Sequence, residues 1–368
     1  MLHELDQGEF HRVLPLFRGY LQDPMMHAVI EARSRGRVFV DDAAGPGAAL
    51  VCTGAECAYV VGGQGSSQFN EALRQLVLEE IIPAARAGGR DFLSLFSFPE
   101  SYAEELEILF GDQVPLRSPL STFSFNQDRF HARHGAPPAQ QVGIPILKEL
   151  NKEVLARPEN AYLADEVATH WGTIERFAQE GTGFCAVDGE DLVSWCYVQA
   201  YGHGAQTIDI WTAPTYRRKG LGTRVAAAVI SKSLSDGYDP FWICDKANVG
   251  SRGLAERLGF RYTGDIFLVD IPFDPYAFYR GLADGFFMPN GEYRQAAESY
   301  ERACRIQPGG AEDYYHAAVA WASAGEGDRA LEHLRKALES GWTDMERAAS
   351  EPAFGALPRA KWQALMDD

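Results

Sequence analysis

The sequence predicts an α+β (α/β) fold with two mixed β-sheet domains in tandem and an all-α tail. The first two parts of the chain show the same order of helices, short apolar strands, a glycine-containing turn and a further helix. Strand patterns stop near residue 273, and a helical pattern then repeats at an offset of 34 residues. We therefore expect domains at residues 1–134, 135–273 and 274–368.

The composition is that of a folded, acidic protein. Of the 368 residues, 46 % are hydrophobic and 12 % aromatic, which is enough for packed cores. No apolar run has the length of a membrane span, and the N-terminus lacks the pattern of a secretion signal. The six cysteines form no C-x-x-C pair, which predicts reduced thiols in a cytoplasmic protein. The net charge of −17 argues against nucleic acid as a partner, and it fits both a cationic acceptor and simple solubility.

The first part of the chain alternates between helical and strand patterns. We expect two helices within 8–35, and further strands and helices at 37–41, 48–52, 58–61, 70–87, 91–96 and 102–110. The turn Gly62–Gly65 opens the helix at 70–87, and its glycines would let a phosphate approach the backbone. No arginine or lysine precedes this turn, so its affinity for phosphate should be low. We therefore interpret the first part as an inert copy of the second.

The second part begins after Gly135–Pro138, because paired prolines favour extended backbone between domains. Its strands alternate branched or aromatic residues with polar ones, and its longest helix has a wide apolar face. We expect two helices within 147–180, a hairpin at 184–187 and 192–198, strands at 207–212 and 241–244, a helix at 221–235, and a strand at 264–271 that closes the sheet.

A strand, a basic turn and a helix start follow one another after residue 206. The first N–H groups of a helix lack partners within it, and the peptide dipoles add partial positive charge there. Glycines let a ligand approach the backbone, and arginines add charge and paired hydrogen bonds. The sequence therefore predicts a cradle for a diphosphate, formed by Arg217, Arg218, Lys219, Gly220, Leu221, Gly222 and Thr223.

The run R-x-x-G-x-G in this cradle differs from the Walker A and dinucleotide-binding loops. It resembles the coenzyme A loop of the GNAT superfamily of N-acetyltransferases, and the later run from Asn248 to Phe260, which ends in LGF, resembles the same superfamily. The double-domain layout is similar to the GNAT subgroup that includes the zwittermicin A self-resistance acetyltransferase. The resemblance implies a degenerate GNAT-like domain at 1–134 and an acetyl-CoA-binding GNAT domain at 135–273.

The resemblance also implies where acetyl-CoA binds. The strand at 207–212 and the strand Trp242–Cys244 would diverge, and the pantetheine arm would lie between them. Backbone N–H groups there would bind the arm and polarise the thioester carbonyl. Together with the cradle, the implied cofactor-binding residues are Ile210, Trp211, Thr212, Asn248 and Ser251, and no metal is expected.

An amine must lose a proton before it attacks a thioester, so a base is needed nearby. Asp209 is the only carboxylate on its strand and is our candidate, although strand alternation also allows it a purely structural role. Many GNAT members carry a tyrosine as general acid three residues before the leucine of LGF, where this chain has Ala255. Water or another residue must then supply the proton, or the thiolate leaves unaided.

The acceptor pocket of this fold is usually lined by the early helices and the hairpin. The aromatic and acidic residues there would suit a cationic amine, or they are surface charges and core aromatics. They are Asp165, Glu166, His170, Trp171, Tyr197 and Tyr201. We expect an N-acetyltransferase that moves an acetyl group from acetyl-CoA to a primary amine of a small molecule, such as an antibiotic or a metabolite. The alternative is a non-catalytic acetyl-CoA-binding adaptor that recruits a protein partner through its helical tail.

The tail repeats Gly291–Ala303 as Gly325–Ala337, and this period resembles tetratricopeptide repeats. Phe287 aligns with Trp321 at the same offset. Two repeats seldom stand alone, so we expect them to pack on the second domain or to end in a capping helix within 357–366. The tail can be a peptide-binding groove, a dimer contact or a stabilising appendage.

Overall fold

The computed structural model describes residues 2–54, 57–134, 145–308, 310–358, 360–362 and 365. The chain divides into two compact units, of which the first is Met1–Gly111 with Leu116–Ile271 and the second is Asp112–Pro115 with Pro272–Asp368. None of the helices in this described part combines the length and apolar character that a bilayer crossing requires. The expected boundary at 134/135 and the segment Gly135–Pro138 lie at or outside the edge of the described residues, so that boundary stays a prediction.

The N-terminal half of the first unit has the expected strands within a few residues, and it adds a strand and a helix after residue 115. Its strands are β1 (His3–Glu4), β2 (Gly36–Val40), β3 (Ala49–Thr53), β4 (Cys57–Val61), β5 (Phe92–Phe98) and β6 (Leu116–Ser124). Its helices are α1 (Pro24–Ile30), α2 (Ser67–Leu76), α3 (Ile82–Ala87), α4 (Tyr102–Leu109) and α5 (Gln127–His134), with a 3-10 segment at Gln7–Phe17.

The C-terminal half of the first unit starts with a strand, whereas the sequence predicted a helix from residue 147. This prediction was wrong for residues 147–149, because they pair with β8 at the edge of the sheet. The strands are β7 (Ile146–Glu149), β8 (Gly183–Asp188), β9 (Asp191–Gly202), β10 (Ala205–Thr212), β11 (Asp239–Asp245) and β12 (Arg261–Pro272). The helices are α6 (Lys152–Leu155), α7 (Ala161–Trp171), α8 (Ile174–Glu180), α9 (Leu221–Ser235) and α10 (Val249–Arg257).

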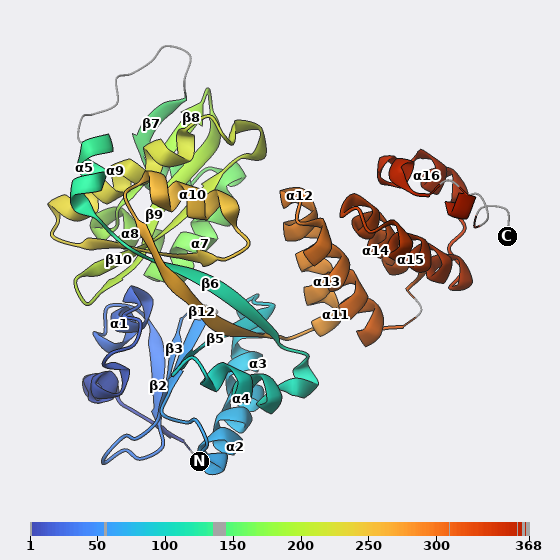
Figure 1. Ribbon diagram of the computed structural model, residues 1–368. Coiled ribbons are helices and arrows are strands. Elements are labelled where there is room, and N and C mark those ends of the chain that lie inside the picture. Colours follow the sequence, from blue (N-terminus) through green and yellow to red (C-terminus); the bar gives the residue numbers. More distant parts are fainter. Residues whose placement is uncertain are drawn as a thin grey trace. The chain divides into compact units, whose positions relative to one another are not determined.

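The two halves share one sheet, so the prediction of two separate sheets was wrong. The sheet has 12 strands in the order β1-β2-β3-β4-β5-β12-β6-β11-β10-β9-β8-β7. Strand β6 of the N-terminal half lies between β12 and β11 of the C-terminal half, with Leu120 opposite both Ile266 and Asp245. Strand β12, expected to close the sheet, instead lies at its centre beside β5. Figure 1 shows β6 and β12 running from one half to the other.

Each half of this sheet is covered by its own hydrophobic core. In the C-terminal half, Leu221, Val225 and Val229 of α9 are buried against strands β8 to β11, as the apolar face of this helix predicts. In the N-terminal half, α1 and the 3-10 segment pack on the first strands of the sheet. The α9 core fixes the start of that helix relative to β10, and this positions the candidate site.

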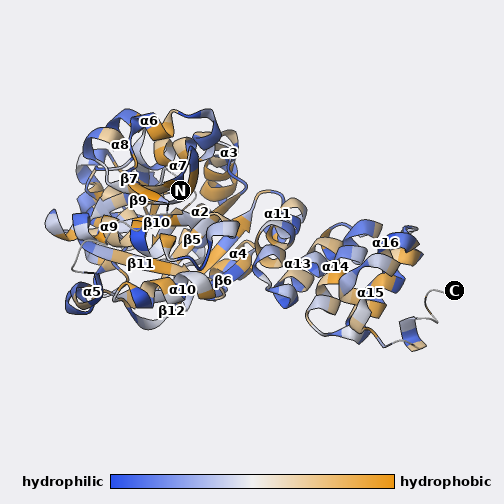
Figure 2. Cartoon of the chain, turned by 90° about the horizontal axis from the view of Figure 1, so that it is seen from above, coloured by the Kyte–Doolittle hydropathy of each residue, from blue (hydrophilic) through white to orange (hydrophobic). Residues whose placement is uncertain are grey.

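The second unit consists of helices in its described part: α11 (Pro275–Gly281), α12 (Met288–Asn290), α13 (Tyr293–Ile306), α14 (Ala311–Ser323), α15 (Gly327–Glu339) and α16 (Met345–Ser350). A π-helical stretch, Leu282–Phe287, joins α11 to α12. Helix α13 packs on α11 and α14, and α14 packs on α15, with the alanines that the repeat pattern contains buried between them. Figure 2 shows hydrophobic and hydrophilic residues along each of these helices.

Two helix ends in this unit are equivalent at an offset of 34 residues. Gly291 and Gly325 both have positive φ, 77° and 80°. The N–H of the residue after each glycine donates to the carbonyl five residues earlier, from Glu292 to Phe287 and from Glu326 to Trp321, both at 2.9 Å. This is the hydrogen-bond pattern of a Schellman cap. The helical tail is therefore present, and its membership of the tetratricopeptide family stays a prediction.

Candidate functional site

Strands β10 and β11 pair only over part of their length. Their parallel register runs from Ala205 opposite Asp239 to Thr207 opposite Phe241. Beyond it, β10 continues along β9 and β11 continues along β6. A register shift in the pairing of β10 with β9 falls between Thr207 and Ile208, where the two strands part. The backbone of β10 from Ile208 onward thus borders an opening in the sheet.

The predicted cradle lies at the end of this opening, where β10 leads into α9. Gly220 has φ 81° and is the N-cap of α9, so this position favours glycine. The first helical hydrogen bond runs from Arg224 N–H to Gly220 O at 3.1 Å. The N–H groups of Leu221, Gly222 and Thr223 precede that bond, and N–H groups in this position of a helix attract anions.

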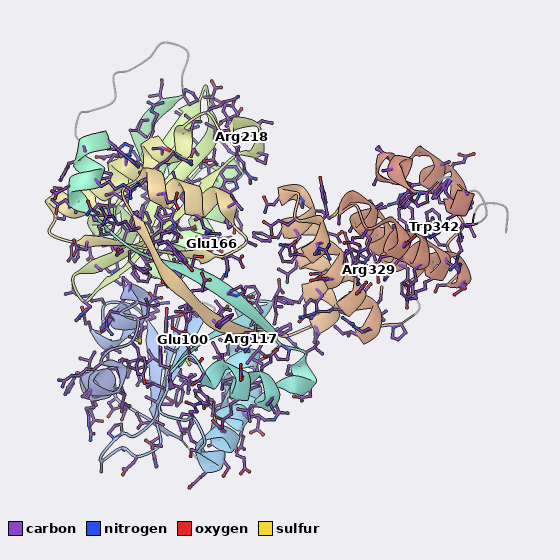
Figure 3. All side chains as sticks on the ribbon, viewed as in Figure 1. Glu100, Arg117, Glu166, Arg218, Arg329 and Trp342 are labelled. Carbon is purple, nitrogen blue, oxygen red and sulfur yellow. The ribbon has the colours of Figure 1, made fainter. Side chains whose placement is uncertain are left out.

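The basic side chains of the cradle are exposed. Arg217 donates from Nε to Thr212 O at 3.2 Å, which ties the turn to the end of β10. Lys219 Nζ lies 4.8 Å from the centre of the Tyr216 ring. The Tyr216 hydroxyl donates to Asp188 at 2.7 Å, and this hydrogen bond raises the pKa of Tyr216. Arg218 has φ 61° and is labelled in Figure 3.

Gly222 sits against the strand opening. A Cβ atom added there would lie 3.3 Å from Thr212 Oγ1 and 3.7 Å from both Ile210 Cδ1 and Leu254 Cδ2. The absence of a side chain at this position thus lets the start of α9 pack closely on β10 and α10.

Asp209 and Ile210, two of the predicted site residues, contact each other. The Ile210 N–H donates to Asp209 Oδ1 at 2.7 Å. Asp209 is half-buried and lies directly opposite Tyr197 of β9. The amide that the family resemblance assigns to the thioester therefore faces a carboxylate in this structure. Trp211 and Thr212, the next two predicted residues, continue along β9 opposite Trp195 and Ser194.

Asn248 and Ser251 lie at the start of α10. The Asn248 side chain caps this helix, because its Oδ1 accepts from the Ser251 N–H at 2.9 Å. Ser251 Oγ accepts from Trp242 Nε1 at 3.2 Å. Ala255, one turn further along, is fully buried and carries no group that could donate a proton. The first two residues thus have helix-capping and packing contacts, and their binding to the cofactor stays a prediction.

The face of the sheet that carries Asp209 is aromatic and is covered by α7 and α8. Trp195 stacks on Trp211 with ring centres 6.3 Å apart, and Tyr197 meets Phe177 of α8. The Tyr197 hydroxyl lies 3.3 Å from His170 Nδ1. Burial, together with the nearby Asp209 and Glu166, raises the pKa of Tyr197 well above its ordinary value.

Four of the six residues proposed for the acceptor pocket contact one another in pairs, His170 with Tyr197 and Trp171 with Tyr201, with ring centres 6.3 Å and 5.8 Å apart. Trp171 is a core residue that donates from Nε1 to Val198 O at 2.8 Å. Glu166 pairs with Arg90 at 3.5 Å, and the Tyr201 ring faces Arg33. Within the described residues, no group of three His, Cys, Asp or Glu side chains could hold a metal ion.

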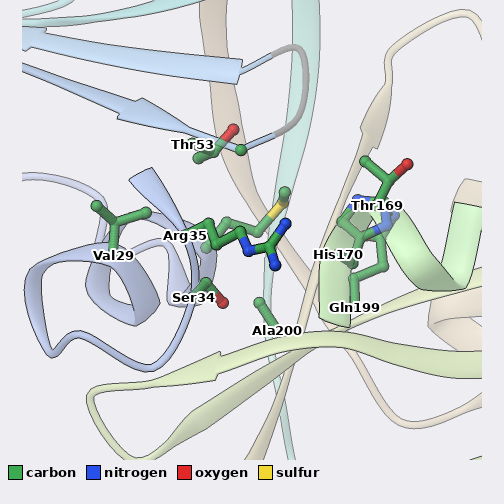
Figure 4. A pocket seen from close by; sticks show the side chains of 10 residues that line it. Val29, Ser34, Arg35, Thr53, Thr169, His170, Gln199 and Ala200 are labelled. Atoms are coloured by element: carbon green, nitrogen blue, oxygen red, sulfur yellow. Dashed lines mark hydrogen bonds between the residues drawn. The ribbon is translucent and has the colours of Figure 1, made fainter. Parts of the chain in front are cut away.

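A hollow that the sequence did not reveal adjoins His170. It lies between α1 and the end of β3 on one side and α7 and β9 on the other. Figure 4 shows Arg35 extending from the N-terminal half toward Thr169 and His170. Residues 35 and 170 are 135 positions apart and belong to no common motif, so only the shared sheet brings them together.

The chain is similar to known acetyltransferases along most of the first unit. It is 24% identical to the uncharacterized N-acetyltransferase YdfB of Bacillus subtilis (strain 168) over 261 residues, which cover 71% of this chain and 95% of that protein. It shares its fold with a GCN5-related N-acetyltransferase-like protein from Streptococcus suis, with a TM-score of 0.54 and 19% identity over 72% of this chain and 99% of the other. A tandem GNAT protein from the clavulanic acid biosynthesis pathway has a TM-score of 0.47 and 16% identity, covering 74% and 98% of the two chains.

The family profile of the GNAT acetyltransferases matches residues 14–266. This match covers both halves of the 12-stranded sheet, including the diverging strands, the cradle and the helix α10. The GNAT family uses acetyl-CoA, and the geometry at the start of α9 fits its diphosphate. The chain therefore belongs to the GNAT acetyltransferase family and is an acetyl-CoA-dependent acyltransferase.

Proposed function

We propose that this protein transfers the acetyl group of acetyl-CoA to a primary amine of a small molecule. The observation that carries the proposal is the left-handed Gly220 at the start of α9, directly beside the opening between β10 and β11. The free N–H groups of the helix start and the side chains of Arg217, Arg218 and Lys219 would hold the diphosphate. The pantetheine arm would then enter the opening, with Gly222 leaving room for it.

The acceptor would approach from the opposite face of the sheet, on which Asp209 and Tyr197 lie. The amine nitrogen attacks the thioester carbon, the carbon–sulfur bond breaks, and Asp209 takes the proton that the nitrogen loses. The coenzyme A thiolate leaves and is protonated by water, because Ala255 offers no acid.

Asp209 would serve both steps if its side chain turns. At rest it accepts the hydrogen bond of the Ile210 N–H. When it turns toward the amine, that N–H becomes available to the thioester carbonyl and to the oxyanion that follows. The same movement thus provides the base and uncovers the donor.

The alternative function is a non-catalytic acetyl-CoA-binding adaptor whose helical tail recruits a protein. The buried Ala255 and the engaged Asp209 carboxylate favour it. The 34-residue equivalence of the caps at Gly291 and Gly325 supports a repeat that could present a peptide groove or a self-association surface. None of the six cysteines is part of a disulfide, which supports the cytoplasmic location proposed from the sequence. We also propose that the chain is related to the GNAT subgroup that includes the zwittermicin A self-resistance acetyltransferase, and this relationship would favour the small-molecule acceptor.

Two measurements test the proposed function. Acetyl-CoA should raise the melting temperature, because a ligand that binds the native state stabilises it. A panel of small amines should then release free thiol from acetyl-CoA in the presence of the protein. Turnover on protein lysines or N-termini alone would contradict the small-molecule acceptor. Binding of acetyl-CoA without turnover on any amine, together with capture of a specific protein, would favour the adaptor.

A further inference from the structure

The hollow beside His170 is cationic on a strongly acidic chain. The protein has 51 acidic and 34 basic residues, yet Arg35 lines this hollow and no aspartate or glutamate does among the residues described there. A second hollow is also lined by Arg35 and His170, and it adds Arg176. We define the Arg35 hollow as these two spaces, which share Arg35 and His170 in their lining. Such a local excess of positive charge attracts an anion.

Arg35 has no recorded hydrogen bond or ion pair within the described residues. Its neighbours contrast with it: Arg33 pairs with Glu31 at 2.7 Å, and Arg37 pairs with Glu4 at 2.7 Å. A Cβ atom on Gly172 would lie 3.7 Å from Arg35 Cζ, so the guanidinium rests against the C-terminal end of α7. The helix dipole favours a cation there. This position leaves the planar N–H donors of Arg35 available to a hydrogen-bond acceptor in the hollow.

Three of the four acidic residues on α7 and α8 pair with basic side chains, and one of these pairs joins Glu175 to Lys152 at 2.9 Å. Glu166 of α7 pairs with Arg90, and Glu180 of α8 pairs with Arg176 at 3.1 Å. Further donors line the space, among them the hydroxyl group of Ser34 and the amide of Gln199. A single unpaired guanidinium with neutral donors around it matches a ligand group with one negative charge. A carboxylate fits this set, because it can accept two parallel bonds from the guanidinium.

His170 connects the hollow to the proposed acceptor face. It lines both parts of the hollow, and its Nδ1 lies 2.9 Å from Glu166 O and 3.3 Å from the Tyr197 hydroxyl. Tyr197 lies directly opposite Asp209. One end of this path therefore carries a carboxylate suited to an amine, and the other end carries a cation suited to an acid.

We propose that the Arg35 hollow binds the carboxylate of the acetyl acceptor, so that the acceptor is an amine of the amino-acid class. This inference rests on the proposed function. The amine is held near Asp209, and the carboxylate pairs with Arg35 at the junction of the two halves. The N-terminal half, which has no basic coenzyme A loop, thereby contributes a specificity residue to the C-terminal half.

The test compares lysine and a series of ω-amino acids, whose reacting amine lies several bonds from the carboxylate, with their carboxamides, which keep the amine and remove the charge. Thiol release from acetyl-CoA gives kcat/KM for each pair, and calorimetry in the presence of coenzyme A gives binding. At least one acid should be preferred over its amide by about tenfold or more. Arg35→Gln should abolish this preference by lowering kcat/KM for the acid far more than for the amide.

Arg18→Gln is the matched control, because Arg18 is an exposed arginine of the same half that lines neither hollow. It should retain the preference. The inference is overturned if no acid is preferred, if no amino acid reacts or binds, or if the preference survives in Arg35→Gln. Acetylation of amines without a carboxylate would then leave the proposed function intact. If acetyl-CoA does not raise the melting temperature, the cradle is refuted instead. Calorimetric binding of the acid and of its amide would then still test whether the Arg35 hollow binds a carboxylate.

Discussion

At the scale of single residues, Gly222 is a position of the cradle where both the size and the charge of a side chain should affect acetyl-CoA binding. We predict that Gly222→Glu weakens acetyl-CoA binding by at least about tenfold, because the side chain fills the space beside Thr212 and Ile210 and repels the diphosphate. Calorimetric titration with acetyl-CoA measures the effect. Gly8→Glu adds the same charge where nothing lies within 4 Å of a Cβ, and it should bind as the wild type does. Equal affinities of the two variants would contradict the placement of the cradle.

Substitution of Asp209 can separate its hydrogen bond with the Ile210 N–H from its proposed role as the catalytic base. Asn in its place keeps an oxygen for the Ile210 N–H but cannot take a proton. We therefore predict that Asp209→Asn lowers kcat by about 100-fold or more while the affinity for acetyl-CoA changes little. Steady-state kinetics with the best amine of the panel provides the measurement. Asp239→Asn, an exposed carboxylate at the start of β11, is the control with unchanged kcat.

At the scale of an element, α1 holds two buried titratable groups whose effects on stability oppose each other. Burial raises the pKa of Asp23 to about 6, although Met25 N–H and the Tyr59 hydroxyl donate to it. Burial and the stacked His203 lower the pKa of His27 to about 4. The contribution of Asp23 to the free energy of unfolding is present at low pH, where the carboxyl is protonated, and is lost as the pH rises through 6. The contribution of His27 to the free energy of unfolding is present above pH 6.5, where the imidazole is neutral, and is lost as the pH falls toward 4.

These opposite signs can be separated by substitution. We predict that Asp23→Asn gains about 3 kcal/mol of unfolding free energy relative to the wild type between pH 4 and 6, because only the wild type must ionise a buried carboxyl. For His27→Gln the corresponding difference should change in the opposite direction between pH 4 and 6.5. Urea unfolding at several pH values measures both differences. Parallel profiles of either variant and the wild type would show that its group does not titrate as described.

The elements that could be predicted have a clear local residue pattern, and the elements that were missed lack one. The strand before the cradle was predictable because its residues alternate, and the helix after it because Val225 and Val229 repeat with helical spacing. Strand β6 was missed because Pro119 lies at its centre, and a proline normally argues against a central strand. It is tolerated here, since the Pro119 carbonyl still accepts from Lys246 N–H at 2.9 Å.

The same distinction applies to the candidate site. The cradle is a continuous segment whose residue types and spacing can be recognised in the sequence, and its role in binding the diphosphate stays a prediction. The contact of Asp209 with Ile210 depends on side-chain rotation, and the Arg35 hollow depends on two segments far apart in the chain. Such features arise only when the sheet has formed.

At the scale of the whole molecule, the exchange of β6 and β12 makes each half depend on the other for its central strands. We predict that residues 1–134 and residues 135–273 do not fold as separate fragments, because each leaves a central strand without its neighbours. Circular dichroism and urea unfolding test this, with residues 1–273 as the folded control. Mixing the two fragments should restore a cooperative transition. A cooperative transition of either fragment alone would contradict the interdependence.

The buried Asp270 illustrates how β12 joins the halves. Its carboxylate accepts from Ser94 of β5 at 2.5 Å and from Ser118 of β6 at 3.2 Å. Since these bonds and the strand ladders cross the junction, the halves cannot swing apart like jaws around a hinge. An acceptor must then reach the thioester through movements of side chains and loops, and its entry should be fast compared with rigid-body opening.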